Sequence, residues 1–400
     1  MKFLIFLFSL IISTSGIAQN SFNIASIDSD DYTDLKFLDS RLANKRVVFL
    51  GESQHGINDF NIMKFRLIRY LHKRHNFEVV AFESGIANCG MTNLAKDSLN
   101  GMEILAHTLM GIWRVKGNCE MMDYVRNNHI EIAGIDPNNN ALYLNSKRRN
   151  YFFKDISLSK QFTKLDSIKL FNYEFPRQDW IYGNGNFSPR RNDSISQTLK
   201  NGYNDIKKRV SLLVGVTETQ KAILEKSIES TFRELSKGSD LQKKEDYFID
   251  GIEREKLMAS NLEFLLNTLY PDKKIIVWAH NGHIAKEGPA INNNISIGSY
   301  LPKYIKDRSF VIGLYATDGE FAWGRNKPQK LELDKGSIES IYNGFTSKGV
   351  FVPSTEIKSG MFPHGIPAES DDVSKLYDGI IFIRDVKASQ MVFNKDYKCE

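Results

Sequence analysis

The sequence contains few cysteines, only three in 400 residues: Cys89, Cys119 and Cys399. Their odd number and irregular spacing argue against a disulfide-stapled scaffold and against a zinc site built from cysteine pairs. Cys89 and Cys119 could pair in an oxidising compartment, but the spacing does not decide this. The chain must therefore rely mainly on a hydrophobic core, which 42% apolar residues and this length allow.

A strong excess of charge is lacking as well. The formal net charge of +5 is small for this length and is spread along the chain. No basic tract with interleaved aromatic residues is present, and such a tract is the usual footprint of nucleic-acid binding. We therefore expect no nucleic-acid partner.

Long hydrophobic runs are absent beyond the N-terminus, because no later stretch approaches the roughly 18 apolar residues of a transmembrane helix. The opening MKFLIFLFSLIISTSGIAQN combines Lys2, an apolar run and the small residues Gly16 and Ala18. This layout predicts a signal peptide over residues 1–18 and a mature start near Gln19. The alternative is an uncleaved N-terminal anchor. We expect export to the periplasm or the medium, with no stable membrane anchor after cleavage.

Several catalytic motifs are missing. There is no G-x-S-x-G nucleophile elbow, which argues against an ordinary serine α/β-hydrolase. There is also no HExxH zinc helix and no P-loop. The GNG run near Gly183 lies in a polar stretch and does not match a dinucleotide-binding fingerprint.

What the sequence does contain is a set of short apolar runs that end in glycine or polar residues. They lie near Val47–Leu50, Val79–Phe82, Ile130–Ile135, Ile275–Trp278, Phe310–Tyr315 and Ile380–Ile383. The runs are almost continuously apolar, which is typical of strands covered on both faces in a parallel sheet. We therefore predict an α/β fold with a central, mostly parallel sheet flanked by helices.

Helical patterns separate these runs. Between the first two, apolar residues follow helical spacing, with Asn58 or Asp59 as the expected N-cap. A second helix is expected in YFIDGIEREKLMASNLEFLLNTLY. The polar region of about 152–244 is predicted to be a mainly helical insertion that caps the sheet. Residues 19–400 are thus expected to form one domain with a cap.

Chemically active residues follow four of the predicted strands. They are Glu52 and His55 after the first, Glu83 after the second, Asp136 after the third, and His280 and His283 after the fourth. Taken singly, each could be a helix cap, a turn former or a structural histidine. In a parallel sheet, however, ligands bind beyond the carboxyl ends of the strands. The coincidence of four strand ends therefore favours a site for proton transfer to and from a water.

Lys64 occupies the apolar stripe of the first predicted helix. It could point at this crevice, or it could lie at the edge of the stripe with its ammonium group in water. The site residues are also suitable ligand types for zinc or manganese. If a metal is present, His55, His280 and His283 are the expected ligands.

At these positions the chain resembles the erythromycin esterase family. The motifs are GESQHG (51–56), LIRYL (67–71), AFESG (81–85), AGID (133–136), REKLMASN (254–261), WAHNGHI (278–284) and IGSYL (297–301). The resemblance runs in order from about residue 35 to the C-terminus. It implies an α/β fold with a helical portion. It also implies ester hydrolysis, in the known cases macrolide lactone opening, by an activated water without a covalent intermediate or a required metal.

The resemblance also implies roles for individual residues. His55 corresponds to the general base and Glu52 to the carboxylate that orients it. Lys64 stands where the family carries a basic residue, and would stabilise oxyanion charge. Glu83, His280 and His283 correspond to the other polar residues that surround the site in the family. Arg254, which matches a basic position of the family, is expected to contact the substrate together with Asp136 and Trp113.

The expected activity is hydrolysis of a small ester or lactone, either macrolide-like or an acylated envelope glycan. The predicted cap matches no family motif and the chain is predicted to be exported, so the substrate stays open. Two alternatives remain, a metal-dependent, peptidase-like hydrolase at the same site and a non-catalytic ligand-binding protein. No cofactor is expected, although a divalent metal is not excluded, and the oligomeric state is left open.

Overall fold

The computed structural model describes residues 20–137, 155–169, 172, 193–236, 244–287, 295–324, 326–357 and 373–392. The predicted signal peptide, residues 1–18, lies outside them. No helix in these ranges is long and apolar enough to cross a membrane.

The core of the fold is an eight-stranded sheet with the order β1-β9-β10-β6-β2-β5-β3-β4. The strands are β1 (Phe22–Ile24), β2 (Val47–Leu50), β3 (Phe77–Gly85), β4 (Glu131–Asp136), β5 (Lys274–Trp278), β6 (Ser309–Ala316), β9 (Gly349–Pro353) and β10 (Gly379–Ile383). The strands from β10 to β4 in this order are parallel, whereas β9 pairs antiparallel with β10 and with β1. The mostly parallel sheet is therefore confirmed, and all six predicted strands are present.

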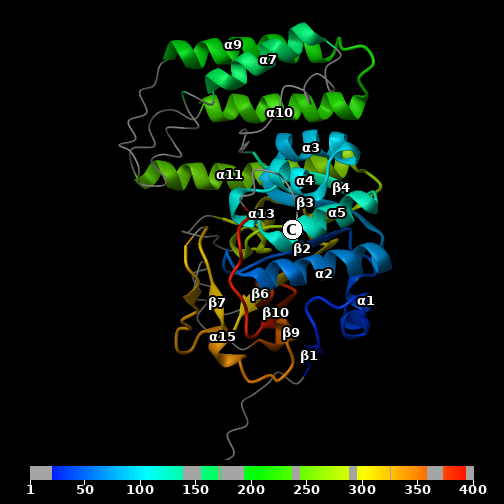
Figure 1. The fold of residues 1–400 in the computed structure, drawn as a ribbon, viewed down its shortest axis with the longest axis vertical. Helices are drawn as coiled ribbons and strands as arrows, with labels where there is room; N and C mark the ends of the chain where they lie inside the picture. Colours follow the sequence, from blue (N-terminus) through cyan, green and yellow to red (C-terminus); the bar gives the residue numbers. More distant parts are fainter. Residues whose placement is uncertain are drawn as a thin grey trace, which may run out of the picture.

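Both faces of the sheet are buried, which explains the continuous apolar runs. Along β2, Val48 and Leu50 belong to a cluster with helices α2 (Asn58–His75), α4 (Gly101–Thr108) and α5 (Lys116–Asn127). Val47 and Phe49 belong to a second cluster with helices α11 (Lys244–Phe264) and α13 (Ile297–Tyr300). Alternate side chains of a strand point to opposite faces, so each strand contributes to both layers. Figure 1 shows the sheet between these helices.

The flanking helices occur mainly between the strands. They are α1 (Asp39–Leu42), α2 (Asn58–His75), α3 (Ile86–Ala95), α4 (Gly101–Thr108), α5 (Lys116–Asn127), α11 (Lys244–Phe264), α12 (Asn281–Ile284), α13 (Ile297–Tyr300), α14 (Lys303–Lys306) and α15 (Ile338–Ile341). Helix α11 is followed by a π-helical turn, Leu265–Leu269. A small second sheet pairs β7 (Glu320–Phe321) with β8 (Gln329–Lys330).

The predicted N-cap of α2 is wrong by one or two residues. Ile57 is the N-cap, with extended backbone and no side-chain capping bond, and Asn58 is already helical. Asp59 is used elsewhere, because its carboxylate accepts the backbone N–H of Lys387 at 2.8 Å and pairs with Lys348 at 2.8 Å. The acidic side chain thus fastens the C-terminal segment to α2 instead of capping the helix.

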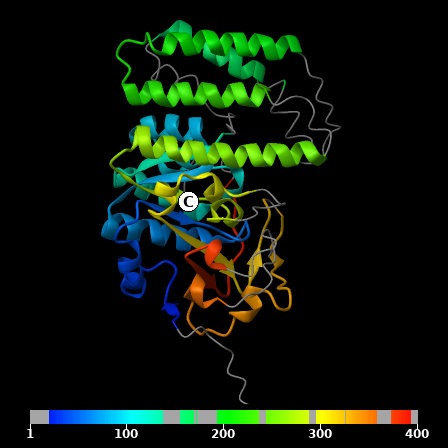
Figure 2. The ribbon, with the colours of Figure 1, turned by 180° about the vertical axis from the view of Figure 1, so that it is seen from behind.

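A helical layer lies at one end of the molecule (Figures 1 and 2). It consists of α7 (Ile156–Lys169), α9 (Asp193–Val210) and α10 (Glu218–Ser236), which share their own hydrophobic cluster. Met91 of α3 joins this cluster, and Gly90 of α3 closely approaches Ile223 of α10. The layer therefore rests on α3, and its role as a cap over the site stays a prediction.

The cysteines do not pair as the sequence allowed. Cys89 is a buried free thiol whose Sγ lies 3.7 Å from the Thr108 carbonyl oxygen. Cys119 is disulfide-bonded. A bond between Cys89 and Cys119 is therefore excluded, and Cys399 lies outside the described residues.

Candidate active site

The strand order brings the predicted site residues to one edge of the sheet. Strands β2, β5, β3 and β4 are direct neighbours, although β5 comes last in the sequence. One register row crosses them near their carboxyl ends, at Leu50, Trp278, Phe82 and Gly134. The candidate residues lie just beyond this row: Glu52 and His55, His280 and His283, Glu83, and Asp136.

His55 and Glu52 form a hydrogen-bonded pair. His55 Nδ1 lies 2.6 Å from Glu52 Oε1. Because an ionised carboxylate only accepts hydrogen bonds, Nδ1 carries a proton, and in the neutral ring Nε2 is then the nitrogen with the lone pair. The side chain of His55 is 17% exposed, whereas Glu52 is buried. His55 is therefore the more exposed member of the pair.

Glu52 is held by donors on both oxygens. Trp113 Nε1 donates to Oε1 at 2.7 Å, and Lys64 Nζ donates to Oε2 at 2.9 Å. Burial by itself raises the pKa of Glu52, but Lys64 and then His55 outweigh burial and lower that pKa to about 2. Glu52 is therefore anionic throughout the physiological range and can fix the tautomer of His55.

Lys64 and Trp113 lie behind Glu52, not at the open side of the site. Both are fully buried. Lys64 Nζ also donates to the Ala279 carbonyl at 3.3 Å and lies 4.4 Å from the centre of the Trp278 ring. Burial lowers the pKa of Lys64, and Glu52 opposes that shift. The sequence predicts that Lys64 faces an oxyanion and that Trp113 contacts substrate, but these buried positions suit holding Glu52 instead.

His280 is tied to the backbone through both ring nitrogens. Nδ1 accepts the Gly282 N–H at 3.1 Å, so Nε2 carries the proton and donates to the Ser53 carbonyl at 3.2 Å. Burial, with smaller contributions from His55 and His283, lowers the pKa of His280 to about 3. The ring is therefore neutral, with its centre 4.9 Å from that of His55.

His283 lies between two carboxylates. Its Nδ1 is 2.5 Å from Glu255 Oε1, and its Nε2 is 3.1 Å from Glu83 Oε1. Burial lowers the pKa of His283, but Glu83 and Glu255 outweigh it and raise that pKa to about 10. His283 is therefore an imidazolium. The sequence analysis did not include Glu255 among the site residues. Its position next to Arg254 in the motif REKLMASN was the one available indication.

Arg254 joins the ends of β3 and β4. Its Nη2 donates to Glu83 Oε1 at 2.8 Å and to Asp136 Oδ2 at 2.5 Å. Burial raises the pKa of Glu83, but His283 and Arg254 hold that pKa well below its usual range. Asp136 is buried and Arg254 is 22% exposed. Of the three residues expected to contact substrate, only Arg254 therefore reaches solvent to a useful extent.

The site groups next to His55 are mostly paired charges. Four carboxylates and three cations belong to the cluster: Glu52, Glu83, Asp136 and Glu255 against Lys64, Arg254 and His283. Each carboxylate has at least one of these cations as a direct partner. The site is therefore strongly polar behind His55.

The histidines are not arranged as a metal site. Within the described ranges, no group of three or more His, Cys, Asp or Glu side chains could hold a metal ion. His280 uses both ring nitrogens on backbone groups, and His283 uses both on carboxylates. The alternative ligand set of His55, His280 and His283 is therefore not assembled.

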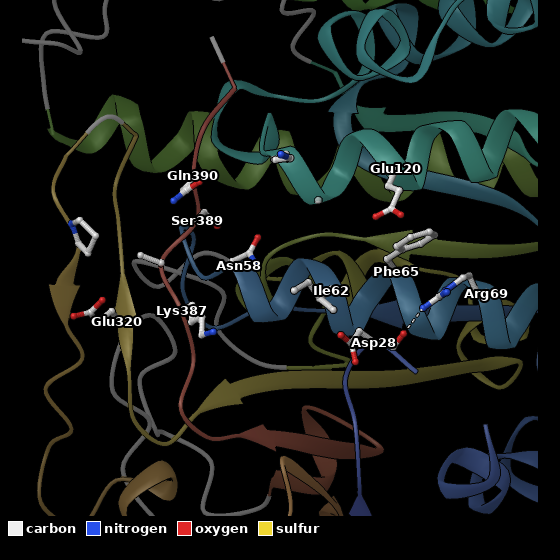
Figure 3. A pocket seen from close by; sticks show the side chains of 14 residues that line it. Asp28, Asn58, Ile62, Phe65, Arg69, Glu120, Glu320, Lys387, Ser389 and Gln390 are labelled. Atoms are coloured by element: carbon white, nitrogen blue, oxygen red, sulfur yellow. Dashed lines mark hydrogen bonds between the residues drawn. The ribbon is translucent and has the colours of Figure 1, made fainter. Parts of the chain in front are cut away.

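A cleft of about 880 Å³ lies outside this cluster, between α2 and α5. Figure 3 shows Ile62, Phe65 and Arg69 of α2 on one side and Glu120 of α5 on the other. Residues 387–390 of the C-terminal segment, Glu320 and Pro328 also line it. None of the predicted site residues lines this cleft, so it is not the catalytic pocket.

The His283 imidazolium predicts a pH dependence of stability. Its folded pKa of about 10 exceeds the ordinary value of 6.5, so the folded state binds the extra proton between these values. This stabilisation is complete below pH 6.5 and is lost as the pH rises toward 10. The free energy of unfolding from urea titrations should therefore fall less steeply over this range in His283→Gln than in the unmutated protein.

His75→Gln is the matched control for this experiment. Burial lowers the pKa of His75, which pairs with Asp39 on the far side of α2, so it is neutral in both states above pH 6.5. The control should keep the slope of the unmutated protein. Equal slopes in His283→Gln and His75→Gln would contradict a charged His283.

Known proteins share this fold and this sequence pattern. The family model described as erythromycin esterase matches residues 72–386. "Putative hydrolase YbfO" of Bacillus subtilis (strain 168) is 25% identical over 408 aligned positions, which cover 90% of this chain and 88% of that protein. Erythromycin esterase type I of Escherichia coli is 23% identical, over 70% of this chain and 73% of that protein.

A solved structure of an erythromycin esterase has the same fold. A mutant of the erythromycin esterase EreC in its open conformation superposes with a TM-score of 0.62 at 16% identity, covering 93% of this chain and 98% of that one. At such identity the likeness establishes the fold alone, and the family model, which spans most of the chain, establishes membership. The chain therefore belongs to the erythromycin esterase family of hydrolases.

Proposed function

We propose that this hydrolase cleaves an ester or lactone bond with a water activated by His55. The observation that carries the proposal is the His55–Glu52 pair. Glu52 accepts a hydrogen bond from the proton-bearing Nδ1, which leaves Nε2 as the acceptor atom of the neutral ring, and His55 is partly exposed whereas Glu52 is buried. A base in this arrangement can take a proton from water in the transition state.

The proposed reaction has two steps. His55 Nε2 takes a proton from water while the water oxygen attacks the ester carbonyl, which forms a tetrahedral oxyanion. The bond from the carbonyl carbon to the leaving oxygen then breaks, and His55 returns its proton to the leaving alkoxide. The products are a carboxylic acid and an alcohol, or a hydroxy acid from a lactone.

The oxyanion needs a cation that it can reach. Lys64 is fully buried behind Glu52, whereas Arg254 is the most exposed cation of the cluster. We therefore assign oxyanion stabilisation to Arg254. The His283 imidazolium lies next to it, with its Nε2 3.2 Å from Arg254 Nη1. Lys64 instead keeps Glu52 ionised and in place.

The relatives and the sequence support two candidate substrate classes. Two of the similar proteins are named erythromycin esterases. A macrolactone is therefore one candidate, and an acylated glycan is the other because the N-terminus predicts export. Both contain a saturated, oxygen-bearing ring: in a macrolactone the ester bond is part of the ring, and in an acylated glycan the ring carries the acyl group.

A hydrolysis screen tests the proposal. The chain from Gln19 onward is incubated with macrolides, short acyl esters and acetylated glycosides, with and without a chelator. We expect turnover of at least one ester class that the chelator does not change. Activity that is lost with chelator and restored by zinc or manganese would contradict a metal-free mechanism. Ligand-induced thermal stabilisation without turnover would instead support a binding protein.

A further inference from the structure

Trp323 is an exposed aromatic residue beside the catalytic histidine. It is 45% exposed, although tryptophan is usually well buried. Its ring centre lies 5.8 Å from that of His55, and the two rings meet at 83°. The buried Trp113 meets His55 at a similar angle, 84°, with ring centres 5.4 Å apart. His55 thus stands between two indoles, of which Trp323 is the solvent-facing one.

A backbone hydrogen bond joins the segment of Trp323 to residues 51–56, the loop that carries Glu52 and His55. The residue before it, Ala322, donates its N–H at 3.0 Å to the carbonyl of Gly56, the residue after His55. Gly56 has φ +84°, and a Cβ there would lie 2.1 Å from the Ala322 oxygen. Only glycine allows this close approach. His55 and Trp323 therefore flank a direct contact between two backbone segments.

The rest of the hairpin is also fastened. Glu320 donates its N–H to Val386, Leu331 donates to Gly319, and Ser389 donates to Gly56, all between 2.8 and 2.9 Å. In Figure 1 the hairpin is the yellow-orange ribbon labelled β7. These bonds connect the hairpin to Gly56 and to the C-terminal segment. They hold the backbone that carries Trp323 beside the segment that carries His55.

An exposed indole next to a catalytic base favours binding of a ligand with a flat or ring-shaped apolar face. The flat, apolar face of an indole binds well to the C–H face of a saturated ring through dispersion and quadrupole interactions. The polar groups of the site, among them His55 and the partly exposed Arg254, can donate hydrogen bonds to oxygen atoms carried by the same substrate. An aliphatic chain would satisfy the indole but not the charged surroundings.

We propose that Trp323 is the platform on which a saturated, oxygen-bearing ring of the substrate stacks while the ester carbonyl reaches His55. This inference rests on the proposed ester hydrolysis and adds the feature of the substrate that is recognised. The ring can come from two sources, a macrolactone or a pyranose that carries an acyl group. In both cases Trp323 determines specificity and takes no part in proton transfer.

The test compares Trp323→Ala and Trp323→Phe on three esters: a macrolactone, an acetylated methyl glycopyranoside and the acyclic ethyl butyrate. For a ring substrate that is turned over, Trp323→Ala should raise KM about tenfold with kcat within about twofold, and Trp323→Phe should keep most of the affinity. Ethyl butyrate hydrolysis should be unchanged. Which ring ester shows the effect identifies the source of the ring.

Tyr304→Ala is the matched control, because Tyr304 is an equally exposed aromatic on α14, at the amino end of β6 and opposite the site. It should leave every KM unchanged. Equal losses on ring and acyclic esters in Trp323→Ala, or no loss on ring esters, would overturn the inference.

Failure of the proposed function can be told apart from failure of this inference. If no ester is hydrolysed, binding of the same ring compounds is measured by saturation-transfer NMR on the unmutated chain and on Trp323→Ala. Ring binding that is lost in Trp323→Ala would support the platform even without turnover. Ring binding that is absent, or equal in both proteins, would overturn it.

Discussion

Replacing His55 by alanine is expected to lower kcat by about 10²- to 10⁴-fold on any ester that the protein hydrolyses. The substitution removes the nitrogen that takes the proton from water and later returns it to the leaving oxygen. Glu52 would keep Trp113 and Lys64 as donors, so its carboxylate stays paired. Steady-state kinetics on the best ester of the screen measures the effect.

The matched control is His72→Ala. His72 lies on α2, is partly exposed, and bonds the Tyr124 hydroxyl at 3.1 Å away from the site. It should leave kcat within about twofold, and both variants should melt cooperatively. His55→Ala that kept most of its activity would show that another group activates the water.

Breaking the buried pair of Glu52 and Lys64 is expected to have the largest effect on stability. Both side chains are almost fully buried, and their atoms lie 2.9 Å apart. Glu52→Gln leaves a buried ammonium without its counter-charge, and Lys64→Met leaves a buried carboxylate without its main cation. Each change should lower the free energy of unfolding by about 3–5 kcal/mol. Urea titrations measure these losses.

The double variant separates stability from activity. Glu52→Gln with Lys64→Met removes both charges, so it should cost clearly less than the sum of the single changes. It should remain inactive, because His55 has lost the carboxylate that orients it. Lys303→Met is the control, since its i,i+4 pair with Asp307 is exposed and should contribute about 1 kcal/mol or less. Additive losses in the double variant would contradict a tightly coupled pair.

The sequence predicted the sheet well because its parallel strands are buried on both faces. Runs such as Val47–Leu50 are apolar at every position, and their bounds match β2. Two strands of the main sheet were not predicted, and both lie toward one edge: β1 has only three residues and is partly exposed, and β9 pairs antiparallel beside it. Short edge strands carry little periodic signal.

The sequence predicted most of the residues that form the site but not the role of each one. Carboxyl ends of parallel strands meet at one edge, so Glu52, His55 and His280 could be grouped from sequence alone. Which side of a carboxylate a lysine occupies depends on packing, so the burial of Lys64 behind Glu52 could not be read from a helical stripe. The hairpin that carries Trp323 has no periodic pattern, and its contact with Gly56 joins residues far apart in the chain.

The neutral state of His280 is another feature that the sequence could not predict. Two histidines three residues apart suggest similar roles, yet one is neutral and the other charged in the fold. The difference comes from their partners: His280 meets backbone groups, whereas His283 meets Glu83 and Glu255. Sequence spacing placed both rings at the site but could not assign their protonation.

The most direct test of the central claim is a single turnover in oxygen-18 water with enzyme in excess over ester. The products are analysed for label, and the protein is quenched rapidly and weighed by intact mass spectrometry. Direct attack by a His55-activated water predicts one labelled oxygen in the carboxylate of the first turnover, an unlabelled alcohol and no mass added to the protein. An acylated protein, or label in the alcohol, would contradict it.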